Sequence, residues 1–514
     1  MSQKVSVSEI SKHASPDDCW VVVNGKVYDL SSFAPSHPGG ANIIYAWAGR
    51  DASKTYNEYH AKNLIENELE DSDKKGELDE STVTDTWVKA QKTEEDKAPD
   101  QNEKPPLSSI INLNDFEEAF AKSASKKANA YVAGASNDLL TLRANAQHWQ
   151  KLWFRPRVMK NVSKVQMRTK ILGQEVSMPV WIAPMGTGIL GGPEAEAALG
   201  AGAAASGIIH CMSTVASLPI EEILATAPGY PWFFQLYVDK QRAKSEALLR
   251  KLAGQPQFKA LFVTTDLPVV SKREADERIR TVEVQPLYLG GTKSAFDNKG
   301  AGIARNNGGF IDATFNWDDL AWLKKHTGLP IVLKGIQSVA DAKKALEMGC
   351  AGIVISNHGG RALDNAPSTV MILLELRRDC PEVLEKMEVF VDGGIRRGSD
   401  ILKALCLGAR AVGVGRPFQC SIQYGHKGVE HCASGESAFM LREVTHAKDG
   451  DTDSGVVLQD ELETAMRLCG VTDVNEVRGD MSFLNTSELE MLLPPEQERY
   501  PALQFGWSRI WSKL

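Results

Sequence analysis

The stretch VISNHGGRALD, residues 354–364, places a histidine and an arginine directly after an apolar run that is typical of a buried strand. The imidazole of His358 can take up a proton near neutral pH. Arg361 can hold a carboxylate through two parallel hydrogen bonds, and Gly359 and Gly360 let the chain approach a ligand closely. The stretch therefore predicts a site that binds an acid and moves a proton. A strand-end turn with a surface His and Arg is the alternative.

The elements around this stretch repeat one pattern, in which short apolar runs alternate with helix-like segments that often end in glycine. The runs cover residues 180–185, 207–213, 233–238, 260–266, 331–336, 352–358, 389–394 and 411–416. Eight buried strands separated by helices predict an α/β fold, a closed (β/α)8 TIM barrel. A doubly wound open sheet is the alternative, but no GxGxxG motif follows the first run.

Polar residues gather where these runs end. They are Gln235 and Tyr237 on the third run, Thr264 and Asp266 on the fourth, Lys334 on the fifth and His358 on the sixth. Active sites of TIM barrels lie at the C-terminal ends of the strands. Each of these residues alone could be structural, but ionisable groups at one buried face are costly unless they are paired or functional.

The last two runs lead into DGGIRRG (392–398) and GVGRPF (413–418), which are rich in glycine and arginine. Barrels of this type often bind phosphate in the loops after strands seven and eight, where backbone N–H groups and arginine suit an anion. Two glycine-rich turns with surface arginines are the alternative. A phosphorylated cofactor beside Lys334 points to FMN; pyridoxal phosphate, with Lys334 as its Schiff base, is the second candidate.

Together, SNHGGRALD, FVDGGIRRG, GVGRPF, QLYV and VTTD make residues 107–480 resemble the FMN-dependent L-2-hydroxy acid oxidase and dehydrogenase family. The resemblance implies that His358 is the active-site base and that Asp266 pairs with it. It also implies that Arg361 binds the substrate carboxylate and that Tyr237 binds the substrate hydroxyl. Tyr131 is expected to assist at the carboxylate, with Arg273 as a second cation.

The same resemblance implies a set of FMN ligands. Lys334 is expected near the N1/O2 edge of the flavin, where it would stabilise negative charge. The expected ligands of the isoalloxazine ring are Ser213, Gln235 and Thr264, and those of the ribityl phosphate are Asp392, Gly394, Arg396, Gly415 and Arg416.

Residues 1–75 contain a strand pattern with Asn24-Gly25 as a hairpin turn, the sequence HPGG from His37, and a second histidine, His60. Two histidines on separate elements can ligate a haem iron from opposite sides. With Trp20 and VYDLSSF, this unit resembles the small α+β cytochrome b5-like haem domain, which implies haem b. The fusion resembles the flavocytochrome members of the family, the cytochrome-type L-lactate dehydrogenases.

The predicted domains are a haem domain (1–75), a charged linker (76–106), the barrel (107–480) and a C-terminal tail (481–514). The connection between Asp266 and Pro330 is too long for an ordinary loop, so we expect it to cover the barrel mouth. Met185-Gly186 stands where relatives commonly have Thr-Ala. Gly186 and Val215 are both small, which predicts a pocket that accepts substrates larger than lactate.

The net charge of −8 gives no indication of a nucleic-acid partner, and no apolar stretch is long enough to span a membrane. Eight scattered cysteines without a CxxC pair argue against zinc or a disulfide framework and favour a reducing compartment. The last residues, 512–514, are SKL, a peroxisomal import address. Cytoplasm, or the mitochondrial intermembrane space by family resemblance, is the alternative.

Three functions remain open at this point. The first is a haem-linked L-2-hydroxy acid dehydrogenase, and the second is an oxidase that passes electrons to oxygen and makes hydrogen peroxide. The third is a non-catalytic haem carrier or sensor, against which the intact set of polar residues argues. The acceptor is either a cytochrome c-like protein or oxygen, and the resemblance implies a homo-oligomer, a tetramer.

Overall fold

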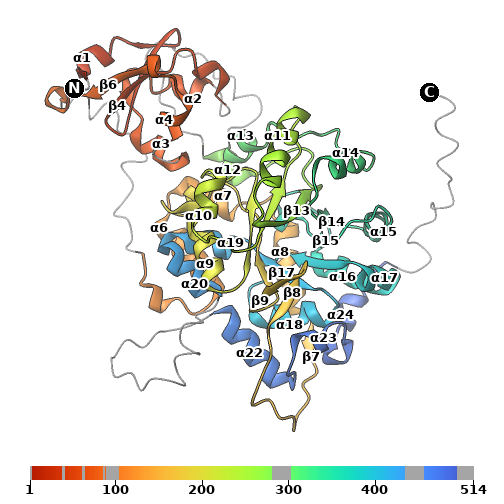
Figure 1. Ribbon diagram of the computed structural model, residues 1–514. Coiled ribbons are helices and arrows are strands. Elements are labelled where there is room, and N and C mark those ends of the chain that lie inside the picture. The colour runs from red at the N-terminus through yellow and green to blue at the C-terminus, as the bar shows by residue number, and fades with distance from the viewer. Residues whose placement is uncertain are drawn as a thin grey trace, which may run out of the picture.

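The structure is a computed structural model that describes residues 3–37, 41–60, 64–84, 87, 104–279, 302–433 and 457–494 (Figure 1). It contains a small N-terminal sheet and a closed eight-stranded parallel barrel. The predicted TIM barrel and the predicted α+β haem domain are therefore confirmed. Among the described residues, no helix combines the length and the apolar character needed to cross a membrane.

The barrel strands follow the chain order around the barrel. They are β10 (Val180–Ile182), β11 (Ile209–Ser213), β12 (Trp232–Leu236), β13 (Phe258–Thr264), β14 (Ile331–Ile336), β15 (Gly352–Ile355), β16 (Glu388–Asp392) and β17 (Ala411–Val414). Pairing of β10 with both β11 and β17 closes the ring. Most strands end earlier than the apolar runs suggested, so Tyr237, Asp266 and His358 lie in the loops directly after β12, β13 and β15.

Large aromatic side chains fill the inside of the barrel. Trp181 and Phe262 have ring centroids 5.2 Å apart, Phe233 and Phe262 are stacked at 5.0 Å, and Phe390 completes the cluster. All four are completely buried. Such filling makes the barrel interior a packed core rather than a pore, so a ligand can enter only at the end of the barrel.

An outer layer of helices covers the barrel (Figure 1). Its main members are α9 (Ala195–Ala205), α11 (Arg242–Ala253), α14 (Asp319–His326), α15 (Val339–Glu347), α16 (Thr369–Asp379), α18 (Gly398–Cys406) and α20 (Gly425–Ala433). The three helices before the barrel are α6 (Leu113–Ser123), α7 (Lys126–Ala133) and α8 (Leu140–Gln150). Helix α8 packs against the turn that carries His358, and the indole of Trp149 donates to the carbonyl of Gly393 at 3.0 Å. These helices therefore cover part of the catalytic face.

The long connection after β13 is described in part. Helices α12 (Glu274–Arg278) and α13 (Ile303–Gly308) belong to it, and the residues between them lie outside the described part of the chain. Asp276 accepts from the backbone N–H groups of Ile303 and Ala304, which ties the two helices together. Ala304, Gly308 and Ile311 line the pocket described below, so the described end of this connection lies at the barrel mouth as expected.

The N-terminal unit is built on the predicted hairpin. Strands β3 (Asp18–Val23) and β4 (Lys26–Asp29) are joined by Asn24 (φ 53°) and Gly25 (φ 77°), the positive φ pair of a tight hairpin turn. Strand β6 (Lys74–Leu78) pairs with β4 and with β1 (Lys4–Val5). The expected domain boundary at residue 75 therefore falls inside β6, an inner strand of the sheet whose residues 76–78 come from the segment predicted as linker.

The beginning of the predicted C-terminal tail also packs on a domain. Strand β18 (Leu484–Asn485) pairs with β7 (Trp153–Phe154), so the barrel unit continues past residue 480. Residues 512–514, the SKL sequence, lie outside the described residues. All eight cysteines are buried and none forms a disulfide, as the scattered spacing predicted.

Two glycines of the same backbone conformation allow a test of how tightly the catalytic face is packed. Gly360 (φ +80°) and Gly229 (φ +78°) both adopt the left-handed region, but a Cβ on Gly360 would lie 2.8 Å from the backbone N of Leu142 while one on Gly229 would meet nothing within 4 Å. Gly229→Ala should cost about 1–2 kcal/mol of backbone strain. Gly360→Ala should cost about 1–3 kcal/mol more, because α8 must shift. Equal melting temperatures for the two variants in thermal unfolding would contradict this.

Candidate active site

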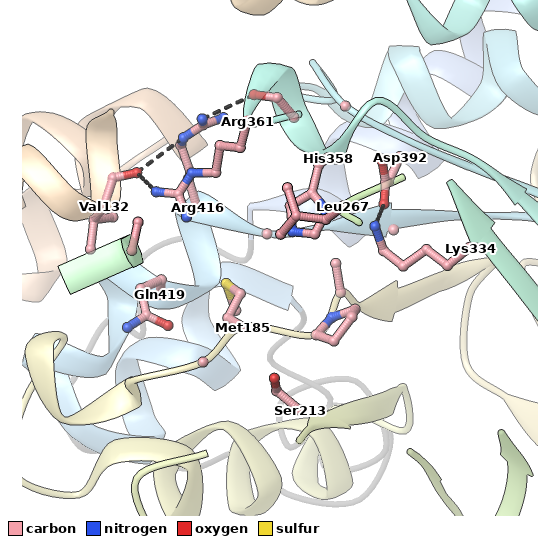
Figure 2. Close-up of a pocket in the computed structure, with 18 of the residues that line it drawn as sticks. Val132, Met185, Ser213, Leu267, Lys334, His358, Arg361, Asp392, Arg416 and Gln419 are labelled. Carbon is pink, nitrogen blue, oxygen red and sulfur yellow. Dashed lines mark hydrogen bonds and ion pairs between the residues drawn. The ribbon is translucent and has the colours of Figure 1, made fainter. Parts of the chain in front are cut away.

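A pocket opens at the C-terminal ends of the barrel strands (Figure 2). Twelve of the predicted site residues line it: Tyr131, Ser213, Tyr237, Arg273, Lys334, His358, Arg361, Asp392, Gly394, Arg396, Gly415 and Arg416. The other three barrel residues lie behind the lining: Gln235 bonds Ser213, Asp266 bonds His358, and Thr264 bonds Gln235. The structure thus brings every predicted barrel residue to one site.

His358 and Asp266 form an acid–base pair at the centre of the pocket. The imidazole Nδ1 lies 3.0 Å from Oδ1 of Asp266, whose side chain is completely buried, and Nε2 lies 3.3 Å from the hydroxyl of Tyr237. Burial lowers the pKa of His358 below its ordinary value, although Asp266 opposes the shift. Burial alone would raise the pKa of Asp266, but the charge and hydrogen bond of His358 hold it below its usual range. The resting pair is therefore a neutral imidazole beside a carboxylate, ready to accept a proton.

The backbone around His358 is held in an uncommon conformation. His358 (φ 59°), Gly359 (φ 63°) and Gly360 (φ 80°) adopt positive φ in succession, which is rare for a residue with a side chain. The N–H of His358 donates to Ser356 Oγ at 3.0 Å, and Asn357 Oδ1 accepts from the N–H of Gly360 at 3.1 Å. These bonds stabilise a strained turn that directs the imidazole into the pocket.

Three arginines, Arg273, Arg361 and Arg416, line the same pocket as His358. Arg361 donates to the carbonyls of Tyr131, Val132 and Gly134 at the end of α7, and Arg416 donates to the carbonyls of Val132, Gly134 and Gly359. Burial lowers the pKa of Arg361, and the charges of Arg416 and Arg273 lower it further. The buried Nε of Arg273 has no partner in the part of the chain that the structure describes. An anion bound here would relieve this repulsion.

Lys334 lies on the other side of His358 from Arg361 and Arg416 (Figure 2). Its Nζ is 3.1 Å from Oδ2 of Asp392 and donates to Ser356 Oγ at 3.0 Å, with both charged side chains less than a tenth exposed. Burial alone would lower the pKa of Lys334, but Asp392 and Asp266 raise it above its ordinary value. The ammonium therefore stays charged, as stabilising a reduced flavin requires.

The expected flavin-ring ligands form a row across three adjacent strands. Ser213 Oγ donates to Oε1 of Gln235 at 3.0 Å, and Nε2 of Gln235 donates to Thr264 Oγ1 at 2.9 Å. Ser213 on β11 stands opposite Gln235 on β12 in the register. Such a row of donors and acceptors suits a flat ring with an amide edge.

Each of the two expected phosphate loops contains a glycine, and the surroundings of the two glycines differ. A Cβ on Gly394 (φ 83°) would lie 2.3 Å from the carbonyl O of Asn145, so this glycine is needed for contact with α8. A Cβ on Gly415 would meet only the sulfur of Met185, at 3.9 Å, so this backbone is open toward the pocket. Nearby, Arg396 pairs with Glu117 at 2.9 Å, and Oδ1 of Asp392 has no partner among the described residues. The open backbone, the arginines and the unpartnered acceptor fit a ribityl phosphate chain.

The two histidines of the N-terminal unit also come together. His37 follows the short helix η1 (Ala34–Ser36) and His60 follows α3 (Ser53–Tyr59); their ring centroids are 6.0 Å apart, with the ring planes at 77°. This separation leaves room for one iron between the rings. Burial, and then His37, lower the pKa of His60 to about 4. Both features fit haem, because neutral imidazole is the form that binds metal.

Sequence reasoning missed two polar residues of the site, Gln419 in the pocket lining and Ser356, which bonds a lining residue. Gln419 lies in the pocket wall one turn beyond Arg416 on α19 (Arg416–Ser421), and its Nε2 donates to the carbonyl of Thr187 at 3.2 Å. Ser356 bonds Lys334 from the end of β15. Helical spacing from Arg416 could have indicated Gln419. Ser356 stands in the quoted SNHGG motif but carried no charge to mark it.

Comparisons with known proteins identify the chain. The family model of FMN-dependent dehydrogenases matches residues 120–447, and that of the cytochrome b5-like haem/steroid binding domain matches residues 6–79. The chain belongs to the FMN-dependent dehydrogenase family. It is an oxidoreductase with an FMN barrel and a haem domain, so the hypothesis of a non-catalytic haem carrier is not supported.

Individual relatives agree with this assignment. The chain is 37% identical to an L-lactate dehydrogenase (cytochrome) of Saccharomyces cerevisiae over 98% of its own length and 84% of the relative's. It is 38% identical to a peroxisomal (S)-2-hydroxy-acid oxidase of Oryza sativa subsp. japonica over 71% of this chain and 94% of that protein. The structure of a double mutant of flavocytochrome b2 with pyruvate bound aligns with a TM-score of 0.63 and 36% identity, covering 76% of this chain and 90% of the other.

The His358–Asp266 pair makes a prediction about pH. With His358 as the expected base, which accepts a proton only when neutral, kcat/KM should fall as the pH drops through the pKa of His358, which burial lowers below its ordinary 6.5. Asp266→Asn removes the group that raises this pKa, so the acid limb should move to lower pH. Because the imidazolium loses its partner, kcat should also fall, by about 10²–10⁴-fold.

Full pH profiles of kcat/KM for the variant and the parent test this prediction. Asp239→Asn is the matched control, because Asp239 also follows a barrel strand but accepts only from the backbone N–H of Gln241. An acid limb that stays in place in Asp266→Asn would contradict the pairing.

Proposed function

We propose that this chain oxidises an L-2-hydroxy acid larger than lactate to the 2-oxo acid on FMN, and that the electrons pass to haem b. The observation that carries the proposal is the His358–Asp266 pair, which lies between a cluster of buried arginines and a buried lysine in one pocket. When bound, FMN supplies the two-electron acceptor for the substrate carbon.

Arg361 and Arg273 bind the substrate carboxylate in this proposal. Arg361 uses Nε and Nη2 for backbone carbonyls, which fixes the guanidinium and leaves Nη1 for an acid. Arg273 lines the same pocket, and its buried Nε, which has no partner among the described residues, is a second donor for the acid. Two fixed cations orient the acid, and the side chain of Tyr131 lines the same wall. A fixed carboxylate places the hydroxyl-bearing carbon at one position relative to His358.

His358 then takes the proton that the substrate releases. Its Nε2 faces the hydroxyl of Tyr237, which marks where the substrate hydroxyl binds. Burial, and then the charge of Asp266, raise the pKa of Tyr237, so the phenol stays protonated and donates a hydrogen bond. Asp266 stabilises the imidazolium that forms. Lys334, held charged by Asp392, balances the negative charge that oxidation of the substrate brings to the flavin edge.

The apolar wall of the pocket limits the size of the substrate. A Cβ on Gly186 would lie 2.3 Å from Cγ2 of Val215, so Val215 fills the space that a larger residue 186 would occupy. The space expected for a substrate larger than lactate therefore depends on the residues at positions 186 and 215 together. The rest of the wall is apolar, formed by Leu267, Val270, Ala304 and Ile311. This lining supports a branched aliphatic side chain on the substrate.

The proposed acceptor after the haem is a cytochrome c-like protein. An oxidase function, with oxygen as acceptor, hydrogen peroxide as product and the peroxisome as its compartment, is the second candidate, because the barrel is similar to a peroxisomal (S)-2-hydroxy-acid oxidase. Cytoplasm or the mitochondrial intermembrane space would suit the first candidate. We also propose a homo-oligomer, a tetramer by the family resemblance.

Anaerobic visible spectra test the electron path. After addition of an L-2-hydroxy acid, the flavin absorbance should bleach and sharp bands of reduced haem should follow. Flavin that bleaches while haem stays oxidised would favour the oxidase. If neither chromophore changes with L-lactate, 2-hydroxy-4-methylpentanoate or mandelate, the proposed substrate class is wrong.

A variant of the wall tests substrate size. Val215→Leu adds a methylene group to the wall, so it should lower the ratio of kcat/KM for 2-hydroxy-4-methylpentanoate to that for L-lactate by about tenfold or more. Val158→Leu, on an exposed loop (82% exposed), is the control and should leave the ratio unchanged. A parent enzyme that strongly prefers lactate or glycolate would exclude the larger substrate.

A further inference from the structure

One short segment touches both the FMN pocket and the haem domain. Met185 and Gly186 line the pocket, and the helical turn that follows, η6 (Gly188–Leu190), lies against α3 of the haem domain. Helix α3 faces the barrel and ends at His60, the proposed haem ligand (Figure 1). The position of this segment therefore bears on how the two cofactor sites lie relative to each other.

The buried carboxylate of Glu196 fixes this segment through hydrogen bonds to backbone N–H groups. It lies in α9 and is completely buried, and its Oε1 accepts from the N–H of Gly188 at 2.7 Å and from the N–H of Ser217 at 2.9 Å. Gly188 follows β10 and Ser217 follows β11, so one carboxylate oxygen joins two barrel loops. Backbone N–H groups bonded to a buried carboxylate are among the stronger hydrogen bonds, and no residue of the catalytic set takes part in them.

Two further hydrogen bonds join the segment to the loop after β11. The N–H of Thr187 donates to the carbonyl of Val215 at 3.0 Å, and that of Ile189 donates to Ser217 Oγ at 3.2 Å. Thr187 has φ +60°, a left-handed conformation that costs energy in a residue with a side chain. A Cβ on Gly188 would lie 2.6 Å from Cδ of Glu196, so the backbone rests directly on the carboxylate.

We propose that Glu196 is a positioning residue for electron transfer between the cofactors: it fixes η6, on which α3 rests, and so sets the distance from the FMN pocket to the haem held by His60. The inference rests on the proposed function. Oxidation of one hydroxy acid to the 2-oxo acid releases two electrons and two protons. With FMN and haem bound, the electrons would pass one at a time through the single haem held by His37 and His60, which the cytochrome c-like acceptor would re-oxidise after each transfer. Glu196 acts only on the electron step between the domains.

The first test measures structure without turnover. Glu196→Gln keeps the size and one acceptor oxygen but removes the charge. In the full-length holoenzyme, amide hydrogen exchange should rise both in residues 187–190 and in α3. Glu194→Gln is the matched control on the same stretch of chain, because its carboxylate is half exposed and bonds the N–H of His426. A rise in exchange confined to residues 187–190 would overturn the proposal, since α3 would then not depend on the hydrogen bonds that Glu196 makes.

The second test separates the two electron steps by anaerobic stopped flow. Glu196→Gln should reduce flavin at nearly the parent rate and reduce haem several-fold more slowly, while Glu194→Gln changes neither rate. Ser217→Ala, which removes one bond to the segment, should slow haem reduction in the same direction but less. Slower flavin reduction with unchanged haem reduction would overturn the proposal. Failure of the parent enzyme to reduce its haem would instead contradict the proposed function.

Discussion

The site depends on a chain of buried charges that compensate one another. Asp266 is bonded to His358 and lies near enough to Lys334 to raise its pKa, and Lys334 is in turn paired with Asp392. Breaking a buried ion pair by removing one partner leaves an uncompensated charge and costs about 3–5 kcal/mol. The register of the three barrel strands that supply these charges, Asp266, Lys334 and Asp392, is therefore constrained. Gly335 (φ +111°) shows how closely β14 packs against the residue after β13, since a Cβ on Gly335 would lie 2.5 Å from Cβ of Asp266.

The barrel and most of the site could be predicted because they follow from local patterns. Buried parallel strands appear as apolar runs, and parallel pairing brings all their C-terminal ends to one face. Ionisable residues at the ends of those runs, such as His358, Asp266 and Lys334, are costly to bury unless they pair or function, so their positions alone indicated the site. Family motifs then supplied roles that spacing alone could not.

Other parts could not be predicted because their function depends on tertiary contacts. Ser356 and Gln419 are uncharged, so neither stands out in the sequence, and only the fold shows that Ser356 bonds Lys334 and that Gln419 lines the pocket. Glu196 reads as an ordinary helix residue until folding places two loops on its carboxylate. The predicted boundaries at residues 75 and 480 lie in or near strands that only tertiary pairing reveals. Strand β6 is mostly polar and β18 has only two residues, and pairing with distant segments makes each part of a sheet.

The burial of all eight cysteines has a consequence for the chemistry of the protein over time. Burial raises the pKa of thiols such as Cys211 and Cys432, and only the thiolate is a strong nucleophile. A flavoprotein whose reduced cofactor meets oxygen generates oxidants close to its own side chains. Thiols that are protonated and inaccessible resist this oxidation. The native fold therefore protects its cysteine thiols from oxidants that the enzyme itself forms. Reaction of these thiols with a thiol reagent would report loss of the fold rather than local motion.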